Sequence, residues 1–136
     1  MEWIYINNAD DIKYLEEVFN NFLDSEIVSF NFNSGNYVDS NLIGHEYMTN
    51  TLNIIFQRLD TKPFSIELSF EEMRKLSIYT PLSDECSADI LYAKIIMTNG
   101  FIYWTKWKDF NPCNKDHLRA DTTYIESKRL KWRIIS

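Results

Sequence analysis

The sequence predicts an α+β fold, in which a mostly antiparallel β-sheet or sandwich of about seven or eight strands carries one N-terminal amphipathic helix. Three observations lead to this prediction. Only one early segment has apolar residues at helical spacing, many later segments alternate apolar and polar residues, and the connections are too short for parallel crossovers. With 136 residues and 45% hydrophobic content, the chain is expected to form a single domain over residues 1–136.

The helix is predicted near the N-terminus, after a short strand at residues 3–6. Asn8 or Asp10 can cap its first turn, where Asp10 and Asp11 suit the positive end of the helix dipole. Its apolar positions recur three and four residues apart, at Ile12, Leu15, Val18, Phe19, Phe22 and Leu23. This apolar stripe predicts a helix that packs on a sheet.

Strands with a two-residue period follow the helix. The first spans residues 28–33, and the next two span residues 52–56 and 64–70, with a turn at residues 60–63. Residues 71–76 form either one helical turn or a bend into a fourth short strand at residues 76–79, and we favour the strand. The polar, irregular stretch at residues 37–49 is predicted to be an exposed loop.

The C-terminal half begins with a predicted hairpin. Two β-rich runs, residues 88–97 and 101–107, flank Asn99-Gly100, whose residues both tolerate the positive φ that a tight hairpin turn requires. Residues 109–121 contain Pro112 and are predicted to be a loop. Residues 123–125 and 130–135 then supply a last strand or hairpin.

An aromatic cluster marks the second run of this hairpin. Its members are Phe101, Tyr103, Trp104, Trp107 and Phe110. On a strand, Phe101, Tyr103 and Trp107 share one face, while Trp104 lies on the other. The pattern fits a strand buried on both sides, and it also fits an exposed aromatic patch of the kind that anchors protein interfaces.

The charge composition argues against nucleic-acid binding. The net charge is −6 and the pI is about 4.9, whereas phosphate binding requires clustered basic residues. The one dense basic run is Lys128, Arg129, Lys131 and Arg133. Lys131 and Arg133 alternate with Trp132 and Ile134, so we expect the run to form the solvated face of a strand. An acidic surface suits a basic protein partner instead.

Several other classes of site lack the motifs they require. The two cysteines, Cys86 and Cys113, form no CxxC pair, and the three glycines are too dispersed for a phosphate-binding loop. No signal peptide and no apolar run of membrane-spanning length is recognisable, so we expect a cytoplasmic protein without membrane association. The sequence predicts no cofactor.

Catalysis has few candidate residues. The two histidines, His45 and His117, each stand beside a carboxylate, namely Glu46 and Asp116. Neighbouring side chains need not converge, however, and no HExxH or comparable ligand spacing is present. We therefore expect surface histidines and predict no catalytic residue and no metal site.

One short segment supports a family resemblance. It reads Phe22-Leu23-Asp24-Ser25-Glu26-Ile27, and it resembles the F-H-D-[SA]-E-[IV] signature of a broad bacterial group that includes immunity proteins of polymorphic toxin systems. Later patterns in that group are similar to residues 66–70 and 76–78 of this chain. Leu23 replaces the histidine of the signature, which argues against a site built on an imidazole beside Asp24.

The resemblance implies a non-catalytic protein that binds and neutralises a cognate toxin with an acidic surface. The candidate contact residues are Asp39, His45 and Glu46, in the predicted loop. The signature residues Phe22, Asp24, Ser25 and Glu26 are interpreted as structural, with side-chain oxygens of Asp24 and Ser25 accepting hydrogen bonds from backbone donors at the helix end.

A small-ligand domain with a pocket between helix and sheet is the alternative, and an enzyme using His45 or His117 is a weaker one. Monomer and homodimer both remain open.

Overall fold

The computed structural model describes residues 2–46, 49–79, 90, 92–119 and 122–136. The strands are β1 (Ile4–Tyr5), β2 (Ser25–Asn33), β3 (Tyr37–Val38), β4 (Gly44–His45), β5 (Thr51–Arg58), β6 (Ser65–Ser77), β7 (Lys94–Thr98), β8 (Phe101–Thr105) and β9 (Tyr124–Ile134). The helical elements are α1 (Ala9–Val18), the short turn η1 (Asn20–Phe22) and α2 (Lys115–Arg119). The fold is α+β, as the sequence predicts.

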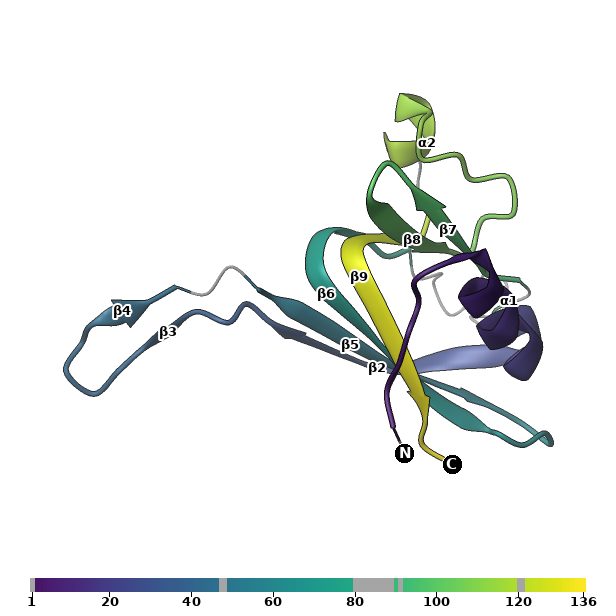
Figure 1. Ribbon diagram of the computed structural model, residues 1–136, viewed down its shortest axis with the longest axis horizontal. Helices are drawn as coiled ribbons and strands as arrows, with labels where there is room; N and C mark the ends of the chain where they lie inside the picture. The colour runs from purple at the N-terminus through teal and green to yellow at the C-terminus, as the bar shows by residue number, and fades with distance from the viewer. Residues whose placement is uncertain (1, 47–48, 80–89, 91, 120–121) are drawn as a thin grey trace.

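One antiparallel sheet of seven strands forms the body of the molecule (Figure 1). Its order is β2-β5-β6-β9-β8-β7, and β1 also pairs with β9. β2 and β7 are the edges of this path, so the sheet is open. A separate two-stranded ribbon, β3–β4, lies at the end of an arm.

Helix α1 begins as the sequence predicts but ends earlier. Asn8 is the N-cap, and its side-chain oxygen accepts a hydrogen bond from the backbone N–H of Asp11 at 2.9 Å. The helix ends at Val18, five positions before the last residue of its predicted apolar stripe, Leu23. The prediction is wrong there because the backbone turns left-handed directly after Phe19.

The left-handed turn η1 has φ values of 47°, 52° and 62° at Asn20, Asn21 and Phe22. Such a run is unfavourable for L-residues, although asparagine tolerates this conformation better than most. The turn delivers Phe22 into the core, where it contacts Phe56 and Trp104. Leu23 points outward instead and is 40% exposed.

The two longest strands, β6 and β9, hold the sheet together. They pair along most of their lengths, from Ile66 opposite Ile134 to Ser77 opposite Tyr124. Residues 71–76 are part of β6, so the preference for strand over a helical turn is confirmed, but the expected separate strand at residues 76–79 is wrong because β6 runs on without a break to Ser77. The C-terminal segment is the single strand β9, rather than a hairpin. Trp132 on β9 is fully buried in the main core.

The predicted hairpin is confirmed at its turn. Asn99 and Gly100 have φ values of 53° and 80°, and β7 and β8 pair on either side of them. β7 begins at Lys94, and most of the predicted run before residue 92 lies outside the described residues, as does Cys86. The predicted loop at residues 109–121 contains the five-residue helix α2, which the sequence pattern did not indicate.

The aromatic cluster on β8 is buried on both faces. Trp104 is fully buried in the main core, and Tyr103 packs with Phe110 and Tyr124 in a second cluster on the other face. Trp107 is half-buried against this second cluster. The interpretation of this segment as a strand that is buried on both sides is therefore confirmed.

The basic run on β9 is only partly solvated. Lys128 and Arg129 are exposed, but Lys131 and Arg133 are half-buried and paired with acids of β6. Arg133 Nη2 lies 2.7 Å from Glu67 Oε1, and its guanidinium covers the ring of Trp3. The expectation of a solvated face is wrong for these two residues, because β6 places Glu67 directly opposite Arg133 and Glu71 diagonally across from Lys131. Neither described helix is long and apolar enough to cross a membrane.

Candidate functional site

The candidate site is an arm that projects from the sheet. β2 and β5 run beyond the body of the molecule, and the β3–β4 ribbon continues past them (Figure 1). In the ribbon, Tyr37 pairs with His45 and Val38 with Gly44. The prediction of an irregular loop at residues 37–49 is therefore wrong in part, because four of these residues form a short hairpin.

The structure brings two of the three predicted contact residues together. His45 Nε2 lies 2.8 Å from Asp39 Oδ2 across the ribbon. The other carboxylate oxygen, Asp39 Oδ1, accepts hydrogen bonds from the backbone N–H groups of Asn41 and Ile43 at 2.9 and 3.1 Å. The hydrogen bond with His45, supported by these backbone donors, lowers the pKa of Asp39. Asp39 thus closes the tip of the arm.

An aromatic contact supports the same pair. The rings of Tyr37 and His45 stack with their centroids 4.5 Å apart and their planes at 9°. His45 therefore packs on a tyrosine while its Nε2 faces Asp39. A ring held on two sides has fewer conformations, so the tip is ordered by its own side chains.

Glu46, the third predicted residue, is exposed and follows β4 directly. The sequence placed His45 beside Glu46 as a conceivable acid–base pair, but the imidazole faces Asp39 instead. Consecutive residues of a strand point to opposite faces, which explains this choice of partner. Glu46 adds an acidic group to the arm.

The arm exposes several large apolar side chains. Leu42 is 86% exposed and Val38 is 67% exposed. Among the described residues of β2 and the arm, the exposed large apolar side chains are Val28, Phe30, Phe32, Tyr37, Val38, Leu42 and Ile43. Single exposed apolar residues are ordinary, but a group along one projection is typical of an interaction surface.

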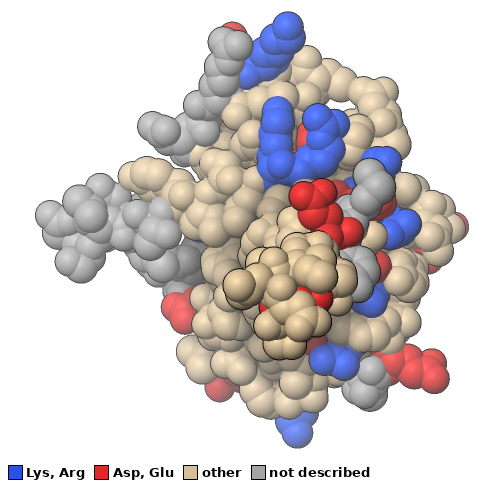
Figure 2. All heavy atoms as spheres, turned by 90° about the vertical axis from the view of Figure 1, so that its left-hand side faces the viewer, with Lys and Arg blue, Asp and Glu red and all other residues tan. Residues whose placement is uncertain are grey.

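Positive side chains are absent from this whole segment of sequence. No lysine or arginine lies between Lys13 and Arg58. The charged residues of β2 and the arm are Glu26, Asp39 and Glu46, with His45 as the one imidazole. Figure 2, which looks at the molecule from the arm side, shows mostly uncharged side chains in the middle of this face, with acidic groups among them and basic groups around them.

The signature segment has a role in the η1 turn that differs in part from the prediction. The hydroxyl of Ser25 donates to the carbonyl oxygen of Phe22 at 2.6 Å, so it satisfies a backbone acceptor and not a donor. The backbone N–H of Asp24 donates to the carbonyl of Ile90 at 2.8 Å, and the side chain of Asp24 is on the surface. Phe22 and Ser25 are buried, whereas Asp24 and Glu26 are exposed.

The second histidine lies on α2, in a different part of the fold (Figure 1). His117 Nδ1 accepts a hydrogen bond from the backbone N–H of Asn111 at 2.9 Å, and its ring lies 4.2 Å from that of Trp107. The hydrogen bond from Asn111 and the contact with Trp107 therefore account for the position of His117. Among the described residues, no three histidine, cysteine, aspartate or glutamate side chains gather as a metal site would require.

Sequence reasoning missed the apolar residues of the arm. Tyr37-Val38 and Leu42-Ile43 flank Asp39-Ser40-Asn41, which are turn-forming residues between two apolar pairs. That pattern is a short hairpin signal. It is weak because each apolar run has only two residues.

Comparison with models of protein families, with curated proteins and with solved structures finds no match for this chain.

Proposed function

We propose that this protein is a non-catalytic binding domain that holds a basic protein partner through the arm, in the manner of an immunity protein that neutralises a toxin. The observation that carries the proposal is the composition of the arm, which exposes apolar side chains and has acidic charges without any lysine or arginine. Residues 22–27 resemble the signature of a bacterial group that includes immunity proteins, and this resemblance supports a toxin as the partner.

The apolar side chains supply the affinity. Leu42 at the tip and Val38 on β3 are among the most exposed large apolar residues that the structure describes. Their burial against a partner removes apolar surface from water, at about 25 cal/mol per Å². Interfaces concentrate their binding energy in a few such central residues.

The acidic groups supply orientation and speed of association. Asp39 and Glu46 stand on an arm without basic residues, in a protein of net charge −6. A partner with a basic surface is attracted at long range, and other acidic proteins are repelled. This contribution weakens with salt, because the Debye length shortens as ionic strength rises.

The order of the arm tip reduces the entropic cost of binding. The contacts of Asp39 with His45, Asn41 and Ile43 fix the turn before a partner arrives. The arm therefore presents Leu42 and Ile43 in one arrangement.

The test begins with capture of partners from the native lysate and identification by mass spectrometry. The binding of the purified partner is then measured by calorimetry at salt concentrations of about 0.05 M and about 0.5 M. We expect a basic partner whose affinity falls with salt. We also expect Leu42→Ser to weaken binding more than about tenfold, and Glu46→Lys about fivefold at low salt.

One variant serves as a control. Asp109→Lys makes the same charge change as Glu46→Lys at an exposed position after β8, and it should leave the affinity nearly unchanged. Asp39→Asn is a further test of the arm: it keeps an oxygen acceptor for the turn while it removes the charge, so it should weaken binding at low salt. Equal affinities for wild type, Leu42→Ser and Glu46→Lys would show that the arm is not the binding surface.

A further inference from the structure

A basic patch lies where β6 and β9 bend together. Its four residues are Arg74 and Lys75 of β6 and Lys128 and Arg129 of β9, and all of them are exposed. β6 curves around the side of the body from which the arm projects (Figure 1). In the view from the arm side, basic side chains gather in the upper part of the same face (Figure 2). The basic patch and the arm therefore lie on one side of the molecule.

The acids beside the basic patch are recessed below its guanidinium groups. The side chain of Arg74 is 56% exposed, whereas that of Glu126, whose Oε2 lies 3.7 Å from Arg74 Nε, is only 7% exposed. The side chain of Arg129 is 51% exposed, and its Nη2 lies 3.6 Å from Glu72 Oε2, on a side chain that is 29% exposed. The outer layer of this surface is therefore positive, although acids lie beneath it.

The two lysines of the basic patch are not neutralised by neighbouring acids. Among the described residues, no carboxylate is close enough to Lys75 or Lys128 to form an ion pair. Their ammonium groups are therefore available to carboxylates of another molecule, and such pairs across an interface set its register and its specificity.

The arm has the opposite character. Asp39 and Glu46 are its charged groups, and apart from Lys13 every lysine and arginine of the chain lies at or after Arg58. The arm also exposes apolar side chains, of which Leu42 is the most exposed. One side of the molecule thus combines an acidic, apolar projection with a basic surface. A face of this kind is complementary to itself.

We propose that two copies of this chain associate about a two-fold axis, so that the arm of each copy lies against the basic patch of the other. A two-fold dimer uses the same surface on both copies, so each contact occurs twice. The acids of the arm then face Lys75 and Lys128, and the apolar tip at Leu42 leaves water. This inference goes beyond the proposed function, because the dimer requires no other protein. The partner proposed above competes with the second copy for the arm.

The net charge of −6 on each copy opposes association, but distance decides between the two electrostatic effects. At an ionic strength of about 0.1 M the Debye length is about 10 Å. Groups that face each other across the interface still attract at this salt concentration, whereas the more distant charges of the two copies are screened. Local complementarity therefore outweighs the net repulsion, and the attraction itself weakens at about 0.5 M salt.

The test is analytical ultracentrifugation of the purified full-length protein, at about 0.1 M and about 0.5 M salt. We expect a dimer at the lower salt concentration, with a dissociation constant that rises at least about fivefold at the higher one. Lys128→Glu and Glu46→Lys should each weaken the dimer by about tenfold or more, because each brings like charges together. The double variant should recover most of this loss, because it restores opposite charges across the interface.

Two variants control for net charge at exposed positions outside the arm and the basic patch. Lys62→Glu, on the turn before β6, matches Lys128→Glu, and Asp109→Lys, after β8, matches Glu46→Lys. Both controls should leave the dissociation constant nearly unchanged.

A protein that stays monomeric at concentrations up to about 0.5 mM would overturn this proposal. Equal losses for Lys128→Glu and Lys62→Glu would also overturn it, because net charge alone would then explain the effect. Neither result touches the proposed function, which is tested by the affinity of the partner for the Leu42 and Glu46 variants.

Discussion

Phe22 packs edge-on against Trp104, with ring centroids 5.7 Å apart and planes at 82°. Phe22 belongs to the left-handed turn η1, and Trp104 belongs to β8, the strand beside the edge strand β7. The contact therefore ties the strained chain reversal after α1 to the main core. A run of three left-handed residues persists only where the surrounding packing compensates for it.

Phe22→Ala should lower the free energy of unfolding by about 3–5 kcal/mol, because it removes a fully buried aromatic side chain. Chemical denaturation measures the change. Phe32→Ala makes the same substitution on a half-exposed residue of β2 and should cost less than about 1 kcal/mol. Similar losses for both variants would mean that η1 is not anchored through Phe22.

The left-handed backbone of η1 leads to a second prediction at Asn21, which is exposed and has a φ of 52°. Asn21→Ala should destabilise the protein by about 1 kcal/mol, because alanine disfavours left-handed conformations. Asn21→Gly accepts this φ without steric strain and should be close to neutral. Thermal unfolding of the two variants distinguishes them, and equal stability would argue against a left-handed residue here.

The sequence could predict most of the fold, because each strand and the Asn99-Gly100 turn depend on local patterns. Alternation places side chains on two faces whatever the tertiary context, and asparagine followed by glycine suits the φ values found there. The end of α1 was missed because Leu23 continues the apolar spacing of the helix. What stops the helix is the burial of Phe22 among aromatic rings, which are distant in sequence.

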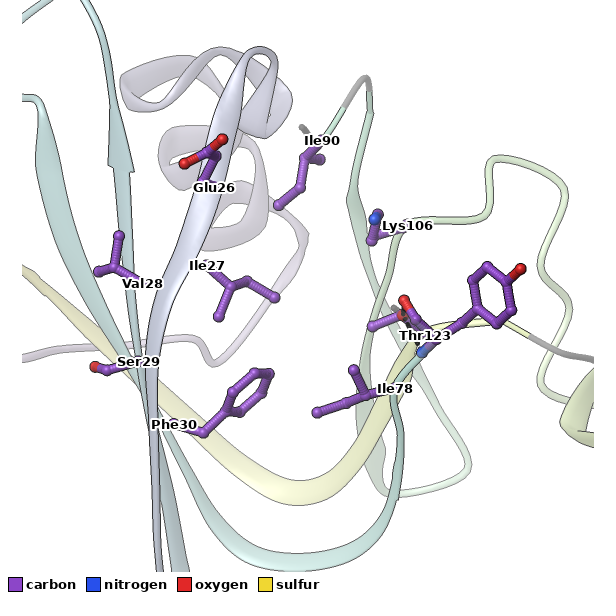
Figure 3. A pocket seen from close by; sticks show the side chains of 10 residues that line it. Glu26, Ile27, Val28, Ser29, Phe30, Ile78, Ile90, Lys106 and Thr123 are labelled. Atoms are coloured by element: carbon purple, nitrogen blue, oxygen red, sulfur yellow. Dashed lines mark hydrogen bonds between the residues drawn. The ribbon is translucent and has the colours of Figure 1, made fainter. Parts of the chain in front are cut away.

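The candidate site was only partly predictable. The sequence indicated recognition residues in the segment of Asp39, His45 and Glu46, but it could not show that Asp39 faces His45 across a ribbon. A hollow of about 450 Å³ beside β2 was not predictable, because its walls come from residues as far apart in sequence as Phe30 and Ile78 (Figure 3).

The buried pair of Tyr103 and Glu126 leads to a third prediction. The tyrosine hydroxyl donates to Glu126 Oε1 at 2.6 Å, and burial together with this carboxylate raises the pKa of Tyr103 above its usual 10.0. Tyr103→Phe leaves a buried carboxylate oxygen without this donor and should cost about 2 kcal/mol of stability. Tyr124→Phe removes a hydrogen bond to a neutral acceptor, the carbonyl of Leu118, and should cost about half as much. Urea unfolding compares the two, and a larger loss for Tyr124→Phe would contradict this ranking.

The arm should respond to acid through Asp39. Its pKa lies below the usual 3.8, first because of the hydrogen bond with His45. A carboxyl group whose folded pKa is depressed stabilises the folded arm above its unfolded pKa, and this stabilisation is lost as the pH falls through the lower folded value. An NMR titration of the Asp39 carboxyl carbon should therefore have its midpoint below 3.8. His45→Phe keeps an aromatic ring beside Tyr37 but removes the imidazole, so the midpoint should rise towards 3.8. His117→Phe, on α2, should leave the midpoint unchanged, and an identical shift in both variants would show that His45 does not hold Asp39 in solution.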